Sequence, residues 1–157
     1  MKATVYVETT VVSYVTARPS RDLVIAGRQQ LTRDWWATCR DRFEVYSSEH
    51  ATGEAAEGDP EFAAARLREL AALPQLKTSN EAITLARRLL ETGAVPAHAE
   101  EDALHVAIAV VNGIDYLVTW NMRHIANATM RHRIDDCCRT AGYDPTVICT
   151  PAALMEG

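Results

Sequence analysis

The sequence has no run of apolar residues that approaches the roughly 20 needed to span a bilayer. The apolar stretch near its start, residues 3–7, is too short for a signal peptide, and the carboxylate of Glu8 follows it at once. These absences argue against a membrane protein and against a secreted one. We therefore expect a cytoplasmic protein that makes no use of a membrane.

Disulfide and zinc-site patterns are also missing. The four cysteines show neither Cys-x-x-Cys spacing nor a disulfide framework, and the neighbours Cys137 and Cys138 point to different sides of a helix. We expect reduced, partly buried thiols that pack as small hydrophobic groups. Because repeats, low-complexity tracts and linkers are lacking too, the 157 residues predict a single domain, 1–157.

The sequence has no surplus of positive charge. It contains 16 basic and 21 acidic residues, which gives a net charge of −5. This balance argues against a protein that holds nucleic acid by bulk charge. It leaves a nuclease open, because bound metal can offset the carboxylates of such an enzyme while its basic residues act locally.

What the sequence does contain is an alternation of strand-like and helix-like segments. Stretches rich in β-branched and aromatic residues predict strands at 3–7, 43–46, 75–78, 115–119 and 146–149. Apolar residues at helical spacing predict helices at about 9–17, 21–40, 48–56, 60–73, 80–92, 98–112 and 128–141. This order implies an α/β fold, a three-layer sandwich whose mostly parallel central sheet of four or five strands has helices on both faces.

The helix expected at 21–40 carries Leu23, Val24 and Trp35 at the spacing of one buried face. Trp36 is adjacent to Trp35, so we expect only one of the two rings to face the core. The other would mark a partner surface or would simply be partly buried.

Three helix starts have recognisable caps. We predict Ser20 as the cap of the 21–40 helix, Asn80 as the cap of the 80–92 helix, and Asp59 before a proline as the cap of the helix between them. Ile83 is expected on the buried face of its helix.

Four oxygen-bearing residues are predicted to meet at one edge of the sheet. Glu8 follows the first strand, Asn121 follows the 115–119 strand, Asp102 lies early in the 98–112 helix, and Glu54 lies on the helix after the second strand. Ligands of parallel sheets bind beyond the carboxyl ends of the strands. Such oxygen ligands suit Mg²⁺ or Mn²⁺, and crowded carboxylates repel one another unless a cation is bound.

Four segments carry a resemblance to a known family. Residues 6–14 look like the opening strand, acid and hydroxyl-bearing turn of PIN domains, and 48–60, 102–109 and 113–121 resemble the later segments of that fold. The resemblance implies a PIN-like sandwich and a Mg²⁺- or Mn²⁺-dependent endoribonuclease that hydrolyses RNA. The chain is similar to the toxins of VapBC-type toxin–antitoxin pairs, which implies a homodimer and an antitoxin partner.

The resemblance implies catalytic and metal-binding roles for Glu8, Glu54, Asp102 and Asn121. Two of these depart from many PIN domains, which carry Asp where this chain has Glu8 and Asn121, although a PIN subgroup shares the pattern. The alternative is therefore a PIN-like module that binds RNA or protein without cutting. A regulatory homodimer that uses an exposed tryptophan surface is a third possibility.

Substrate contacts are predicted for residues beside these ligands: Thr9, Thr119, Arg123 and His124. His98 and His105 lie seven apart, whereas helical zinc pairs usually lie four apart, so we expect no zinc site from them and a semi-buried His105.

Several acidic residues have simpler interpretations. Glu49 or Glu57 could take the place of Glu54, because all three lie close together in the sequence. Glu100 and Glu101 are expected only to complement the positive end of their helix.

Overall fold

The structure, a computed structural model, describes residues 1–155. Its strands are β1 (Thr4–Val7), β2 (Glu44–Ser48), β3 (Gln75–Leu76), β4 (Tyr116–Val118) and β5 (Val147–Cys149). Its helices are α1 (Thr9–Thr16), α2 (Leu23–Arg42), α3 (Glu49–Ala55), α4 (Pro60–Leu70), α5 (Asn80–Glu91), α6 (Glu100–Val111) and α7 (Arg131–Thr140), followed by a short 3-10 helix, η1 (Pro151–Leu154).

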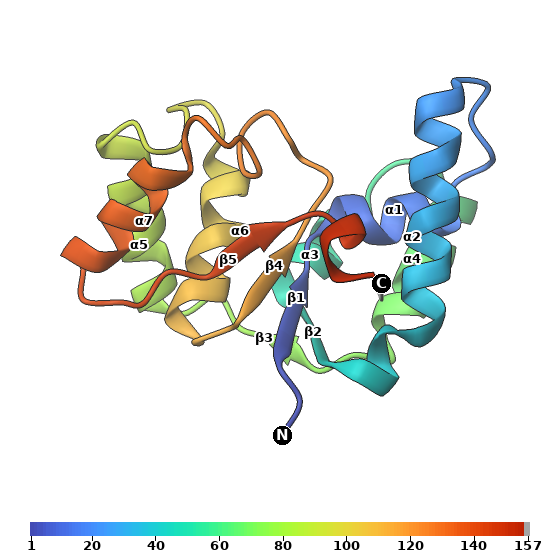
Figure 1. Ribbon diagram of the computed structural model, residues 1–157, viewed down its shortest axis with the longest axis horizontal. Helices are drawn as coiled ribbons and strands as arrows, with labels where there is room; N and C mark the ends of the chain where they lie inside the picture. Colours follow the sequence, from blue (N-terminus) through green and yellow to red (C-terminus); the bar gives the residue numbers. More distant parts are fainter. Residues whose placement is uncertain (156–157) are drawn as a thin grey trace.

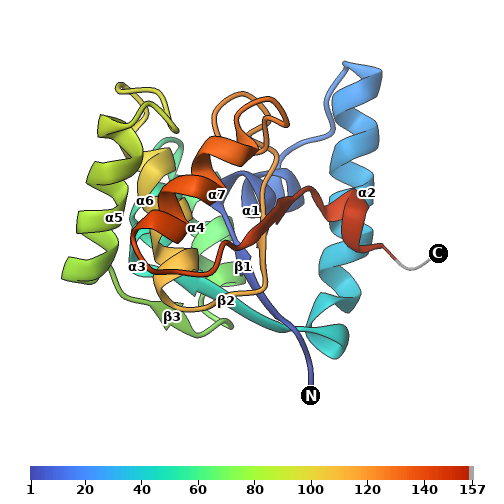
Figure 2. The ribbon, with the colours of Figure 1, turned by 60° about the vertical axis from the view of Figure 1, so that its left-hand side comes forward.

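The five strands form one sheet in the order β3-β2-β1-β4-β5, and every neighbouring pair is parallel. Helices α5, α6 and α7 lie on one side of the sheet and α1, α2 and α4 on the other (Figures 1 and 2). The α/β sandwich expected from the sequence is confirmed, with a sheet that is wholly parallel.

The central strand β1 shows why both faces are covered. Successive side chains of a strand point to opposite faces. Accordingly, Tyr6 packs in the hydrophobic cluster under α5, α6 and α7, while Val5 and Val7 pack in the cluster under α1 and α2. Because all strands run in the same direction, their carboxyl ends share one edge, and the residues that follow β1 and β4 are brought together there.

The helix starts differ from the predicted ones in three places. Asp22 rather than Ser20 caps α2, accepting hydrogen bonds from the amides of Val24 and Ile25. Ser79 rather than Asn80 caps α5. The last helix begins at Arg131 rather than 128. The predicted cap at Asp59 is confirmed.

The expected buried face of α2 is wrong at its first turn. The side chains of Leu23 and Val24 are 87% and 64% exposed, because this end of α2 extends beyond the sheet (Figure 1). Ile83 is exposed on α5 as well, contrary to the prediction.

The expectation that only one tryptophan faces the core is also wrong. Both Trp35 and Trp36 are buried, since α2 is covered from two directions. The indole nitrogen of Trp36 donates to Glu69 Oε2 of α4 at 2.9 Å, which satisfies the polar end of that ring. Neither ring of this pair therefore offers the exposed surface that the sequence predicted for one of them.

The four cysteines are free thiols, as predicted. Burial raises the pKa of the Cys39 thiol to about 11 and that of Cys138 to about 12, so both stay protonated and unreactive at neutral pH. Among residues 1–155, no helix combines the length and the apolar character that crossing a membrane requires.

A fully buried leucine and an exposed leucine give a matched pair of variants. Leu117 is fully buried in β4, so Leu117→Ala should lower the free energy of unfolding by about 2–5 kcal/mol through lost contacts and a cavity. Leu23→Ala, at an exposed position, should change it by less than about 0.5 kcal/mol. Urea unfolding measures both values, and equal losses would contradict the assignment of the core.

Candidate functional site

The site lies at the carboxyl edge of the sheet, where β1 and β4 end side by side. The backbone amide of Glu8 donates to the carbonyl of Val118 at 3.0 Å, which continues the pairing of the two strands by one residue. Thr119 is held in the same way by the carbonyl of Cys149. The backbone therefore fixes Glu8 and Thr119 as neighbours before any side chain is considered.

Glu8 is a buried carboxylate with two hydroxyl donors. Its side chain is only 5% exposed, and its Oε1 accepts from Thr10 Oγ1 at 2.5 Å and from Thr119 Oγ1 at 2.7 Å. These donors orient the carboxylate and support its charge. The other oxygen, Oε2, receives no hydrogen bond from residues 1–155 and lies 3.9 Å from His105 Nε2.

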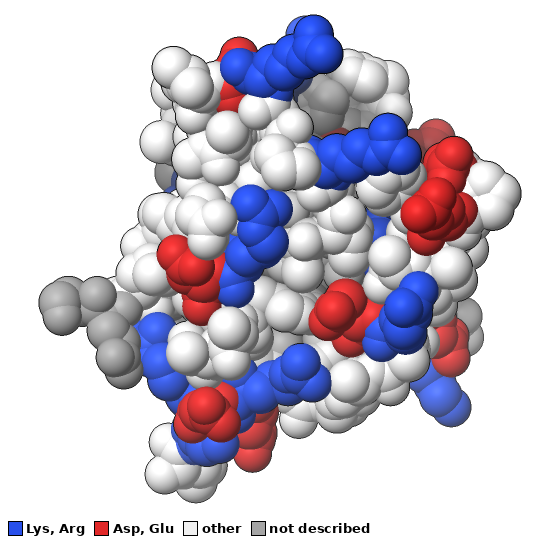
Figure 3. All heavy atoms as spheres, turned by 90° about the vertical axis from the view of Figure 1, so that its right-hand side faces the viewer, with Lys and Arg blue, Asp and Glu red and all other residues white. Residues whose placement is uncertain are grey.

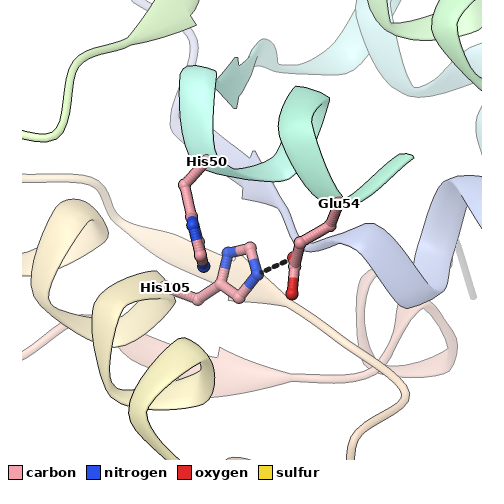
Figure 4. Close-up of side chains that lie close together, drawn as sticks. All are labelled: His50, Glu54 and His105. Atoms are coloured by element: carbon pink, nitrogen blue, oxygen red, sulfur yellow. Dashed lines mark hydrogen bonds and ion pairs between the residues drawn. The ribbon is translucent and has the colours of Figure 1, made fainter. Parts of the chain in front are cut away.

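Glu54 reaches the same imidazole from α3. His105 Nε2 donates to Glu54 Oε1 at 2.5 Å, and Thr9 Oγ1 donates to that oxygen at 2.6 Å (Figure 4). Glu49 and Glu57 are exposed, so Glu54 is the acid of this helix that meets the other site residues.

His105 is fully buried, which corrects the prediction that it is semi-buried. Its Nδ1 lies 2.6 Å from Tyr6 Oη, which in turn lies 2.7 Å from Ser48 Oγ. This chain of polar groups fixes the ring below the carboxylates. Its position three residues after Asp102 on α6 was the available signal, since residues three apart share a helix face.

Burial and hydrogen bonding oppose each other in the His105–Glu54 pair. Burial works against the charge of Glu54, but the hydrogen bonds from His105 and Thr9 outweigh it and lower the pKa of Glu54 to about 2. Burial also lowers the pKa of His105, but the hydrogen bond to Glu54 and the charges of Glu8, Glu54 and Asp102 raise it overall. The imidazole therefore serves as a counter-charge to this acidic cluster.

Asp102 joins the cluster through His124. His124 Nδ1 donates to Asp102 Oδ2 at 2.8 Å, and its backbone amide donates to Asn121 Oδ1 at 3.0 Å. The amide of Asn121 donates to Thr119 Oγ1 at 2.9 Å, and that hydroxyl donates to Glu8. A continuous hydrogen-bond network thus links Glu8 to Asp102.

The four other predicted residues of this region have different surroundings from one another. The side-chain oxygen of Asn121 accepts from the loop backbone, so it organises residues 121–124. Arg123 lies exposed at the surface in that loop. Thr9 and Thr119 donate their hydroxyl protons to Glu54 and Glu8.

Two further residues belong to this region: Glu101, which was expected only to complement its helix end, and His50, which was missed from the sequence. Glu101 shares a hydrogen bond with Glu54, and this contact raises the pKa of Glu101. His50 lies one helical turn before Glu54 on α3, and its ring centre is 4.6 Å from that of His105. Burial lowers the pKa of His50, and the charge of His105 adds to the effect.

Glu8, Glu54 and Asp102 offer carboxylate oxygens of the kind that a hard divalent cation binds, but within residues 1–155 the group whose ligand atoms lie within 4.8 Å of one another is His50, Glu54 and His105. Oxygen ligands from separate elements are what Mg²⁺ and Mn²⁺ prefer. Glu8 Oε2 and Asp102 Oδ1 receive no hydrogen bonds from residues 1–155, so each ordered carboxylate keeps one oxygen for a ligand.

Comparisons of the chain with protein-family models, with curated proteins and with solved structures found no match.

The contact between His105 and Glu54 predicts that the stability of the metal-free protein depends on pH. Since folding raises the pKa of His105 above 6.5, its contribution is complete below that pH and is lost as pH rises through the folded-state value. Glu54, whose pKa falls from 4.5 to about 2, contributes above 4.5 and loses this contribution as pH falls towards 2.

The measurement is the free energy of unfolding against pH in EDTA, for wild type and His105→Gln. The stability advantage of wild type should be largest between pH 4.5 and 6.5 and should shrink on either side. The comparison removes the part of the opposite contribution of His50 that comes from its burial, because both proteins share that part. Parallel curves for the two proteins would contradict the assigned pair.

Proposed function

We propose that this chain is a PIN-type, divalent-metal-dependent endoribonuclease that hydrolyses phosphodiester bonds in RNA. One observation carries the proposal: Glu8 and Glu54, from separate elements, approach the same buried imidazole at the carboxyl edge of a parallel sheet, and a hydrogen-bond network links Glu8 to Asp102. Such a cluster is costly without cations. The RNA substrate, an antitoxin partner and a homodimer are parts of the same proposal, drawn from the resemblance.

The proposed cofactor is Mg²⁺ or Mn²⁺, with Glu8, Glu54 and Asp102 as its ligands. Such an ion, when bound, activates water and stabilises the charge that develops on phosphate oxygens. The protein itself keeps these ligands in fixed orientations through hydrogen bonds. Thr10 and Thr119 orient Glu8, whereas Thr9 and His105 orient Glu54.

The residues after β4 have supporting roles in this proposal. Asn121 holds the loop through the amide of His124, and His124 orients Asp102. His124 uses Nδ1 for that contact, and its Nε2 would donate to a phosphate oxygen of the substrate when the ring carries a second proton. Arg123, exposed beside it, would add a positive charge along the RNA backbone.

The charge distribution is compatible with a local rather than an extended RNA contact. On the face crossed by α2, basic and acidic side chains are interspersed, and neither sign gathers into a track (Figure 3). This face therefore offers no basic track, and the proposed RNA contact is at the carboxyl edge of the sheet, where the carboxylates and His124 lie.

Asp102→Asn tests the nuclease. The amide oxygen can still accept from His124, so the variant removes the charge while keeping this contact. A metal ion supplies several kcal/mol to such a reaction and each 1.4 kcal/mol is tenfold in rate, so cleavage of an RNA panel with Mn²⁺ should fall by about a hundredfold or more.

The control is Asp136→Asn, at an exposed position of α7 far along the chain from the site. It should cleave like wild type. Equal cleavage by wild type and Asp102→Asn would remove Asp102 from the mechanism.

A non-cutting binding module is the second candidate, and His105 favours it. The imidazole already lies beside Glu8 and Glu54 inside the protein and, when protonated, is their positive partner. A protein that keeps this counter-charge permanently would have little need of a metal ion.

Calorimetry separates the two candidates. Titration of wild type with Mn²⁺ should give saturable heat, and Glu8→Gln should weaken the binding at least tenfold because a buried ligand charge is lost. The binding module would instead give only the heat of dilution with both proteins.

A further inference from the structure

A second type of ligand set overlaps the oxygen cluster. His50, Glu54 and His105 each place one potential ligand atom so that all three atoms lie within 4.8 Å of one another. His50 and Glu54 project from α3, and His105 faces them from α6 (Figure 4). Two imidazole nitrogens and one carboxylate oxygen differ chemically from the all-oxygen set described above.

The local structure explains why these side chains converge. His50 and Glu54 are four residues apart on α3, so they share a helix face. That face packs against α6, where His105 is fully buried. His50 and Glu54 are partly exposed, which leaves an approach for an ion from solvent.

In both imidazoles, one ring nitrogen already has a hydrogen-bond partner in the protein, as metal-bound histidines require of the nitrogen that does not bind the metal. Such a histidine usually donates its remaining ring N–H to a protein oxygen, which fixes the tautomer and the ring. His50 Nε2 lies 3.2 Å from the carbonyl oxygen of Glu101, so Nε2 carries the proton and Nδ1 keeps its lone pair. For His105, Tyr6 Oη holds Nδ1, and Nε2 faces Glu54.

We propose that His50, Glu54 and His105 form a binding site for Zn²⁺ or a similar first-row divalent ion. Mixed nitrogen and oxygen ligands suit zinc, whereas Mg²⁺ prefers oxygen alone. The ion takes the place of the proton between His105 Nε2 and Glu54 Oε1, and that proton is released to solvent.

The geometry requires only small movements. Zinc ligands at about 2.0–2.1 Å in a tetrahedron lie about 3.3 Å from each other. The His105–Glu54 separation of 2.5 Å has to widen, and the ligand atom of His50 already lies within 4.8 Å of both other ligand atoms. Three protein ligands leave the fourth position for water or another small ligand.

The test is zinc binding in metal-free buffer, measured by competition with a chromophoric zinc chelator. Wild type should bind one equivalent of Zn²⁺, and His50→Gln should bind at least tenfold more weakly, since its amide can still donate to the Glu101 carbonyl but offers no imidazole. His132→Gln, which changes an exposed histidine of α7, is the matched control and should bind like wild type.

A second measurement locates the ion without any substitution. Zn²⁺ should shift the ring nitrogen resonances of His50 and His105 in the NMR spectrum of the wild-type protein. Shifts confined to other histidines, equal affinity of wild type and His50→Gln, or failure of wild type to bind zinc would each overturn the proposal. No RNA is present in either experiment, so the outcome is independent of nuclease activity.

Discussion

A histidine with no exposed surface lies among carboxylates at the end of a parallel sheet, and the other features of the site depend on this arrangement. His105 contacts Glu54 directly and lies 3.9 Å from Glu8. Charged groups removed from water need partners, and here each partner is supplied by a different element. The sheet edge, α3 and α6 must therefore be in place together for any one of these side chains to be stable.

The same arrangement explains how a small acidic protein can maintain an anionic site. Hydroxyl groups of Thr9, Thr10 and Thr119 donate to two of the carboxylates, while the imidazole balances part of the charge. A bound cation would complete this compensation rather than provide all of it. These carboxylates are consequently oriented without an ion, as the proposed metal site requires.

The sequence predicted the fold well because the fold depends on local patterns. Apolar strands separated by amphipathic helices specify a parallel sheet, and its edge then places Glu8 beside Thr119. The features that the sequence did not predict depend on packing between distant segments. The burial of Trp36 requires Glu69 of α4, and the contact of Glu101 with Glu54 requires the approach of α3 to α6.

The roles of His105 and His50 could not be obtained from spacing alone. His105 lies within the recognisable 102–109 segment, but its complete burial results from Tyr6 of the central strand. His50 and Glu54 are four residues apart, a spacing that the sequence displays. Their partner His105, however, lies 51 residues after Glu54.

Anomalous diffraction from a crystal soaked in Mn²⁺ tests the central claim most directly. An anomalous peak within coordination distance of both Glu8 and Asp102 is the predicted result. A fully soaked crystal with an unoccupied carboxylate cluster and an unchanged His105–Glu54 contact would contradict it.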